Sequence, residues 1–113
     1  MNSFNKDSFC KAVYDIVAQI PAGRACSYGA IAKAIGYPGY SRMVGQAMKL
    51  CGKHLPAHRV VNSQGILSGK DCFEPPEKMQ QLLESEGIQL SNNRIKDWKI
   101  VFWNPMEEIP FEK

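Results

Sequence analysis

The chain has 113 residues, of which 44% are apolar and 22% charged, and its net charge is +3. This length predicts a single domain over residues 1–113, and the composition excludes a wholly disordered chain. No apolar run approaches the ~18 residues that span a bilayer, so no membrane contact is expected. The N-terminus lacks the order of a signal peptide, which predicts a cytoplasmic protein, or a nuclear one in a eukaryote.

The first half of the chain is predicted to be helical. Apolar residues recur at helical spacing over residues 6–19, and Ser27 can cap a short helix over about 28–35. A turn at residues 37–40 precedes a third helix over about 42–51. Two short helices joined by a tight glycine-containing turn are typical of the helix-turn-helix, in which the second helix contacts DNA.

The second half is predicted to contain a hairpin and one more helix. Two short apolar pairs flank turn residues in the segment 60–67, which predicts a small hairpin or wing. Prolines begin a helix over about 75–86, and the aromatic segment 95–103 is expected to pack on the domain. The predicted fold is therefore mainly α, a small winged helix-turn-helix-like domain with a short β-hairpin.

Charged residues are unevenly distributed along the chain. Residues 16–70 contain seven basic residues, two histidines and no acidic residue, whereas residues 71–113 contain nine acidic and five basic ones. A long basic segment without acids favours a nucleic-acid partner over a purely solvated surface. Binding through phosphates should weaken as salt rises, because each contact releases counterions.

Cysteine spacing indicates no metal site. The four cysteines, whose spacing matches no zinc site, are Cys10, Cys26, Cys51 and Cys72. Thiols of a cytoplasmic or nuclear protein are expected to stay reduced. We therefore expect free thiols, no metal and no cofactor.

Residues 56–60 read Pro-Ala-His-Arg-Val and differ at one position from Pro-Cys-His-Arg-Val, the active-site signature of the O6-alkylguanine-DNA alkyltransferases. Further segments follow the family's order, namely residues 20–23, 27–29, Arg42-Met43-Val44-Gly45 and 82–87. Residues 18–90 thus resemble the C-terminal, DNA-binding domain of this family. With Ala57 at the cysteine position, the chain is most similar to the alkyltransferase-like branch.

The resemblance implies recognition of DNA damage without catalysis. Active members transfer the alkyl group to a thiolate, whereas the methyl group of Ala57 has no lone pair, so no enzymatic activity is expected. The implied partner is duplex DNA containing O6-alkylguanine, which is flipped into a pocket and held. The branch is implied to mark such lesions for nucleotide excision repair proteins, and a monomer is expected.

The resemblance also implies roles for individual residues on the DNA side. Arg42 matches the arginine finger that fills the gap left by the flipped base. Tyr28 matches the tyrosine that crowds the phosphate beside the target nucleotide, and Gly45 allows close approach to the minor groove. Lys49 and Ser63 are candidate phosphate contacts.

The pocket for alkylguanine is expected to be formed by Ala57, His58, Arg59 and Val60. His58 and Glu86 match the family's base network, and without a thiol proton to accept they are expected to form a structural hydrogen-bond network. For Arg59, a phosphate contact and an internal structural role are equally open. Two segments depart from the family: residues 51–53 lack its Asn-Pro hinge, and residues 67–72 leave the outer wall of the pocket undefined.

Two alternative functions remain open. One is an active methylated-DNA-protein cysteine methyltransferase that uses another cysteine, or a form in which Ala57 was engineered from cysteine. The other is a winged helix-turn-helix transcription regulator, which predicts strong preference among undamaged sequences.

Overall fold

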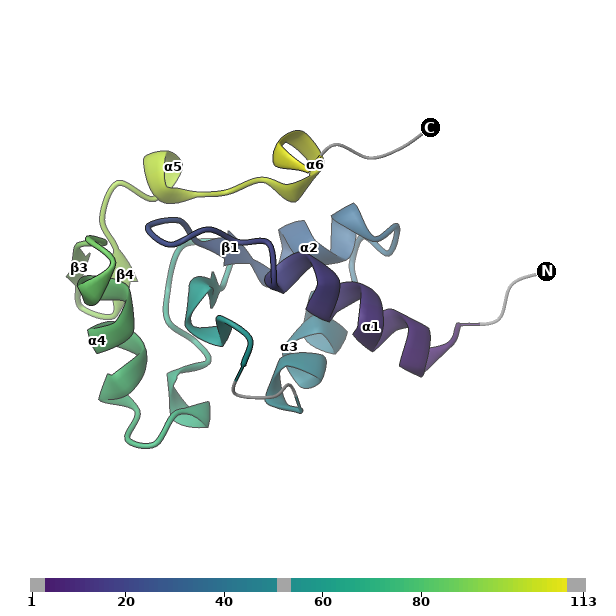
Figure 1. Cartoon of the computed structure of the whole chain (residues 1–113), viewed down its shortest axis with the longest axis horizontal. Coiled ribbons are helices and arrows are strands. Elements are labelled where there is room, and N and C mark those ends of the chain that lie inside the picture. The colour runs from purple at the N-terminus through teal and green to yellow at the C-terminus, as the bar shows by residue number, and fades with distance from the viewer. Residues whose placement is uncertain (1–3, 51–53, 110–113) are drawn as a thin grey trace.

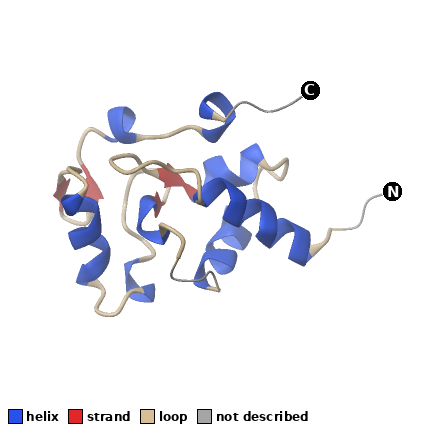
Figure 2. Cartoon of the chain, in the orientation of Figure 1, coloured by secondary structure: helices blue, strands red, loops and turns tan. Residues whose placement is uncertain are grey.

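The computed structural model describes residues 4–50 and 54–109, and most of its regular structure is helical (Figures 1 and 2). Its helices are α1 (Lys6–Val17), α2 (Tyr28–Ala34), α3 (Ser41–Lys49), α4 (Glu77–Ser85), α5 (Trp98–Val101) and α6 (Pro105–Glu108), with two 3-10 helices, η1 (Ala57–Arg59) and η2 (Lys70–Cys72). The strands form two small pairs, β1 (Cys26–Ser27) with β2 (Val60–Val61) and β3 (Leu90–Ser91) with β4 (Arg94–Ile95). No helix in the described part of the chain combines the length and apolarity needed to cross a membrane.

Helix α1 confirms the first predicted helix. It begins after Asn5, whose side chain accepts a hydrogen bond from the N–H of Ser8 at 3.0 Å, a typical N-cap. Its apolar face is buried at Phe9, Val13, Ile16 and Val17. The Tyr14 hydroxyl donates to the carbonyl of Ala47 at 2.8 Å, which links α1 to α3.

Helices α2 and α3 form the predicted helix-turn-helix. Ser27 caps α2, since its hydroxyl accepts a hydrogen bond from the N–H of Ala30 at 3.1 Å. The two helices bury Ile31 and Val44, respectively, in a shared core. Helix α3 ends at Lys49; the end predicted at Cys51, like the missing hinge at 51–53, lies outside the described residues.

The hairpin predicted at residues 60–67 is wrong. Strand β2 pairs in parallel with β1, and Ile66 forms a bridge with Arg94 instead. Val60 and Val61 are both buried, so the segment has no solvent-facing side, as is usual for parallel pairing. The Asn62 side chain accepts hydrogen bonds from the N–H groups of Gln64 and Ile66, both at 2.9 Å, and so closes a local loop.

The antiparallel hairpin lies further along the chain, between β3 and β4. Asn92 and Asn93 join the strands with φ of 53° and 62°. Asparagine accepts this left-handed backbone more readily than most residues, and two such residues in succession suit a two-residue hairpin turn. The Asn92-Asn93 pair is therefore a turn signal that is present in the sequence itself.

Two clusters of buried side chains flank the β1–β2 pair. One joins α1, α2 and α3, and the other joins α4 with the hairpin. Trp103, which is 5% exposed, packs into the first cluster, and Ala25 forms a bridge with Phe102. The C-terminal segment thus packs on the domain as expected, on the edge away from α3 (Figure 1).

Candidate functional site

Six of the predicted site residues line one open hollow of about 780 Å³, which we call the first hollow: Tyr28, Arg42, Gly45, Lys49, Ala57 and Val60. Helix α3 supplies one wall, because residues three and four positions apart share a helix face. The opposite wall is formed by residues 68–73. The sequence had left this outer wall undefined.

The outer face of α3 is open and positively charged. Arg42 and Lys49 are exposed, and within the described residues no hydrogen bond or ion pair engages either side chain. A methyl group added at Gly45 would meet no atom within 4 Å apart from the neighbouring backbone of its own helix. The unpaired side chains of Arg42 and Lys49 therefore flank Gly45, which has no side chain. This arrangement suits the close approach of a polyanion to α3.

Tyr28 spans from α2 to the opposite wall of the first hollow. Its hydroxyl lies so close to Gly69 that a Cβ added there would be 2.6 Å from the oxygen, which explains why a residue without a side chain occupies this position. Burial raises the pKa of Tyr28, and a hydrogen bond with the Ser68 side chain opposes that shift only in part. The hydroxyl is therefore protonated at neutral pH and can donate a hydrogen bond.

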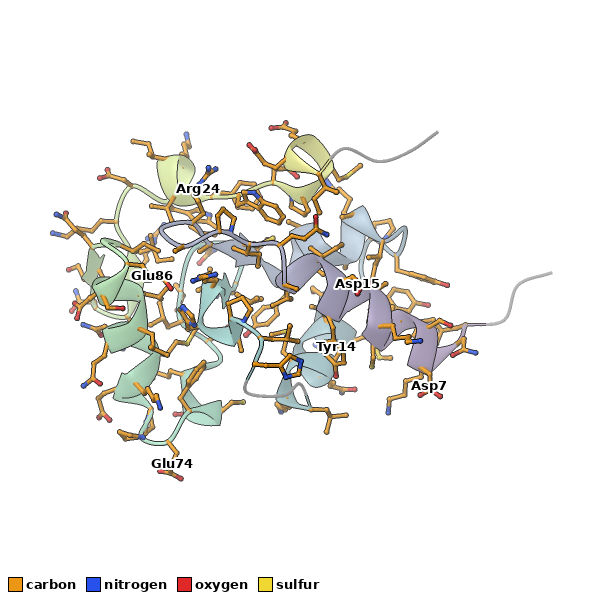
Figure 3. All side chains as sticks on the ribbon, in the orientation of Figure 1. Asp7, Tyr14, Asp15, Arg24, Glu74 and Glu86 are labelled. Atoms are coloured by element: carbon orange, nitrogen blue, oxygen red, sulfur yellow. The ribbon has the colours of Figure 1, made fainter. Side chains whose placement is uncertain are left out.

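Glu86 is the centre of a polar network at the C-terminal end of α4 (Figure 3). Its carboxylate accepts a hydrogen bond from His58 Nε2 at 2.8 Å and one from Arg59 Nη2 at 2.6 Å. The N–H of Gly23 donates to Glu86 Oε1 at 3.3 Å. Arg59 Nη1 also donates to the carbonyl of Ile20 at 2.7 Å, so the network links η1 to the segment that follows α1.

This network fixes the charge of Glu86 and the position of η1. Burial by itself would raise the pKa of Glu86, but the hydrogen bonds from Arg59, His58 and Gly23 outweigh burial and lower the pKa to about 2. The expected His58–Glu86 hydrogen bond is confirmed. Of the two roles left open for Arg59, the structure shows the internal one, in which its guanidinium is consumed by protein acceptors.

Ser63 does not join the other candidate residues. It lies exposed in the loop between β2 and Ile66 and lines neither hollow. Its carbonyl accepts a hydrogen bond from the indole of Trp98 at 3.1 Å.

The basic segment 16–70 contributes less surface charge than its composition suggests. Arg24 donates to the carbonyls of Val101 at 2.9 Å and Phe102 at 2.6 Å, and it lies beneath the C-terminal segment (Figure 3). The exposed cations on the helix-turn-helix are Lys33, Arg42 and Lys49. Among the described residues of this segment, the exposed positive charge therefore lies on α2 and α3.

A second hollow of about 770 Å³ adjoins the first and shares five lining residues with it: Met48, Lys49, Ala57, Cys72 and Phe73. His58 and Arg59 line this second hollow and not the first, which separates them from Val60, whereas Ala57 lines both hollows. Cys72 is an exposed free thiol. Residues 4–50 and 54–109 contain no group of three or more His, Cys, Asp or Glu side chains that could hold a metal.

Comparison with known proteins defines the class to which this fold and site belong. Residues 8–88 match the model of the family described as 6-O-methylguanine DNA methyltransferase, DNA binding domain. The chain belongs to this family.

Individual relatives narrow the similarity further. Alkyltransferase-like protein 1 of Schizosaccharomyces pombe is 38% identical over 105 residues, which cover 88% of this chain and 97% of that protein. The DNA base-flipping protein of Escherichia coli is 39% identical over 103 residues, covering 88% and 77%. The crystal structure of S. pombe Atl1 in complex with damaged DNA containing O6-carboxymethylguanine has a TM-score of 0.78 at 39% identity and covers 90% of this chain and 100% of that one. The predicted fold class and the resemblance to alkyltransferase-like proteins are confirmed.

Proposed function

We propose that this protein, acting as a single domain, binds duplex DNA, turns O6-alkylguanine out of the helix into the first hollow, and holds it without chemical reaction. The observation that best supports this function is that one hollow is lined by the predicted DNA-binding residues together with Ala57, namely Tyr28, Arg42, Gly45 and Lys49. A nucleophile at residue 57 would be required for alkyl transfer, and a methyl group cannot serve as one. The similarity to S. pombe Atl1, crystallised with damaged DNA, supports this function.

We assign a task to each wall of the first hollow. Helix α3 enters the minor groove along its bare surface at Gly45, and Lys49 contacts a phosphate. Arg42 enters the base stack and offsets part of the few kcal/mol that extrusion of a base costs. Tyr28 contacts the phosphate beside the extruded nucleotide, for which its protonated hydroxyl is a suitable donor.

The product of binding is a persistent complex, because no step releases the lesion in a changed form. We infer that this complex, a monomer on DNA, marks the site for nucleotide excision repair proteins. The protein would act where the DNA is, in the cytoplasm of a prokaryote or the nucleus of a eukaryote.

A binding titration on matched duplexes tests this function. The duplexes differ only in carrying guanine or O6-methylguanine at one position, and each is titrated at low and high salt. We expect both affinities to fall with salt to a similar degree, because phosphate contacts are common to both. The preference for O6-methylguanine should persist at both salt concentrations. Equal affinity for the two duplexes would rule out lesion recognition.

One alternative has a specific observation in its favour. Cys72 lines the first hollow together with Ala57, so an extruded guanine and a thiol would share one space. Attack by the Cys72 thiolate on the alkyl carbon would form a thioether and break the bond between that carbon and O6. The electron pair of the broken bond stays on O6, and a proton from water then restores guanine in the DNA. Incubation with a duplex labelled in the O6-methyl group, using wild type and Cys72→Ser, tests this reaction. Label on wild-type protein that Cys72→Ser loses would establish it.

A further inference from the structure

We propose that the second hollow binds the far end of long, anionic substituents on O6 of the extruded guanine. The protein would then prefer lesions whose alkyl chain ends in a carboxylate over neutral lesions of the same length. This inference rests on the proposed function, because the guanine itself must occupy the first hollow.

Continuity of the two hollows is the first argument. Ala57, Met48, Lys49, Cys72 and Phe73 line both hollows, so these residues mark the junction between them. In the proposed complex the O6 substituent faces Ala57, whose side chain is a single methyl group. A chain of several carbons passing that methyl group leads from the first hollow into the second.

The second argument is the apolar lining near the junction. Leu55, Pro56, Phe73 and Leu82 line the second hollow and are half-buried, so their carbon atoms face the space in part. Methylene groups placed against such carbon surfaces leave water, which is worth about 0.8 kcal/mol for each fully buried group. The lining thus suits the middle of an alkyl chain.

The third argument is the charge of the second hollow, which concerns the far end of the alkyl substituent. Lys49, Lys78 and His54 line the second hollow and are exposed, and no hydrogen bond or ion pair engages them within the described residues. Arg59 adds no net charge because Glu86 neutralises it. Among the described residues that line the second hollow, the acidic one is Glu74, whose side chain points away from the domain (Figure 3). Because Lys49 is assigned to a phosphate in the proposed complex, the unpaired ammonium group of Lys78 is the one that favours an anion at the end of the alkyl chain.

The test compares three duplexes that differ only in the group on O6 of one guanine: methyl, pentyl, or 4-carboxybutyl. Pentyl and 4-carboxybutyl have the same number of carbon atoms, so their affinity ratio isolates the terminal charge. For wild type we expect the carboxybutyl duplex to bind roughly threefold to fivefold more tightly than the pentyl duplex, the range of a partly exposed ion pair. This ratio should shrink as salt rises.

Lys78→Glu should abolish or reverse the preference, and Lys78→Gln should give an intermediate ratio. Lys78 is exposed on α4 and lies outside the first hollow, so neither change removes a core contact. Lys99→Glu on α5 is the matched control, because it changes the net charge equally but lines neither hollow. It should leave the ratio unchanged.

Two kinds of outcome would overturn the proposal. A wild-type ratio near one, or a ratio that Lys78→Glu and Lys99→Glu change equally, would show that the second hollow does not select the terminal charge. Equal weakening of every duplex by Lys78→Glu, undamaged DNA included, would instead make Lys78 a phosphate contact. Either result leaves the proposed function standing as long as wild type prefers O6-methylguanine over guanine.

Discussion

Arg42 and Gly45 lie one turn apart on the exposed face of α3, and neither is required by the protein core. Their importance is therefore expected to be visible in DNA binding and not in folding. The sequence could identify both residues because they belong to one short, contiguous segment. It could not show that Arg59 would be turned inward, since that depends on Glu86, which lies 27 positions away.

Gly45→Ala should make the free protein more stable and the complex weaker. Alanine in a helix is favoured over glycine by roughly 1 kcal/mol, and the added methyl group meets nothing beyond the neighbouring backbone of its own helix. The same methyl group would separate α3 from the floor of the minor groove. Thermal unfolding and a titration with O6-methylguanine DNA measure the two effects. Unchanged affinity would show that α3 does not approach DNA at this position.

Arg42→Ala should reduce affinity for the damaged duplex by about tenfold or more, the usual effect of losing a charged hydrogen-bonding group. Undamaged DNA, which needs no filling of the base stack, should be affected less. Lys33→Ala on α2 is the control, because Lys33 is exposed and lines neither hollow. An equal loss of affinity for the damaged and the undamaged duplex would show that Arg42 contacts a phosphate and does not enter the base stack.

Glu86 makes the stability of the protein depend on acid pH. Its folded-state pKa of about 2 lies below the ordinary value of 4.5, so its contribution is complete above about pH 4.5 and is lost as pH falls towards 2. Glu86→Gln should lower the free energy of unfolding at pH 7 by about 1–3 kcal/mol and flatten its decline over that window.

Chemical denaturation between pH 2.5 and 7 measures this effect of Glu86. Glu74→Gln, at an exposed carboxylate, should change neither the stability at pH 7 nor the slope below pH 4.5. If the stability of Glu86→Gln fell with pH as steeply as that of wild type, other carboxylates would determine the response to acid.

At the scale of elements, local signals were reliable and long-range pairing was not. The apolar spacing over residues 6–19 and the cap at Ser27 are local signals, so the sequence alone predicted α1 and α2. Strand β2 pairs with β1, which lies more than thirty residues earlier, and two-residue strands carry almost no pattern. The second hollow was missed for the same reason, because its lining comes from α3, η1, α4 and the segments between them.

The C-terminal segment should contribute to stability through Trp103. Trp103 is buried among α1, α2 and α3, so Trp103→Ala should destabilise the protein by about 3–5 kcal/mol. Ile100→Ala on α5 is the matched control, since Ile100 is 76% exposed and should cost almost nothing. Denaturant midpoints compare the two variants. Similar midpoints would mean that the C-terminal segment is dispensable.

At the scale of the whole molecule, the distribution of charge agrees with the proposed orientation on DNA. The exposed cations of the basic segment occupy α2 and α3, whereas Glu107 and Glu108 lie on α6, which packs against α2 on the side away from α3 (Figure 1). The count of basic residues overstated this asymmetry, because Arg24 and Arg59 are used internally. Composition predicted that the DNA-binding face is positively charged, but not how many of the basic side chains are exposed on it.

The central claim is that the lesion is held without reaction, and the mass of the protein after contact with it tests that claim most directly. Excess duplex carrying O6-methylguanine is incubated with the protein, the complex is isolated, and the protein is separated and weighed by mass spectrometry. The account predicts an unchanged protein mass together with intact O6-methylguanine in the recovered DNA. A protein heavier by one methylene group, with the guanine restored, would contradict it.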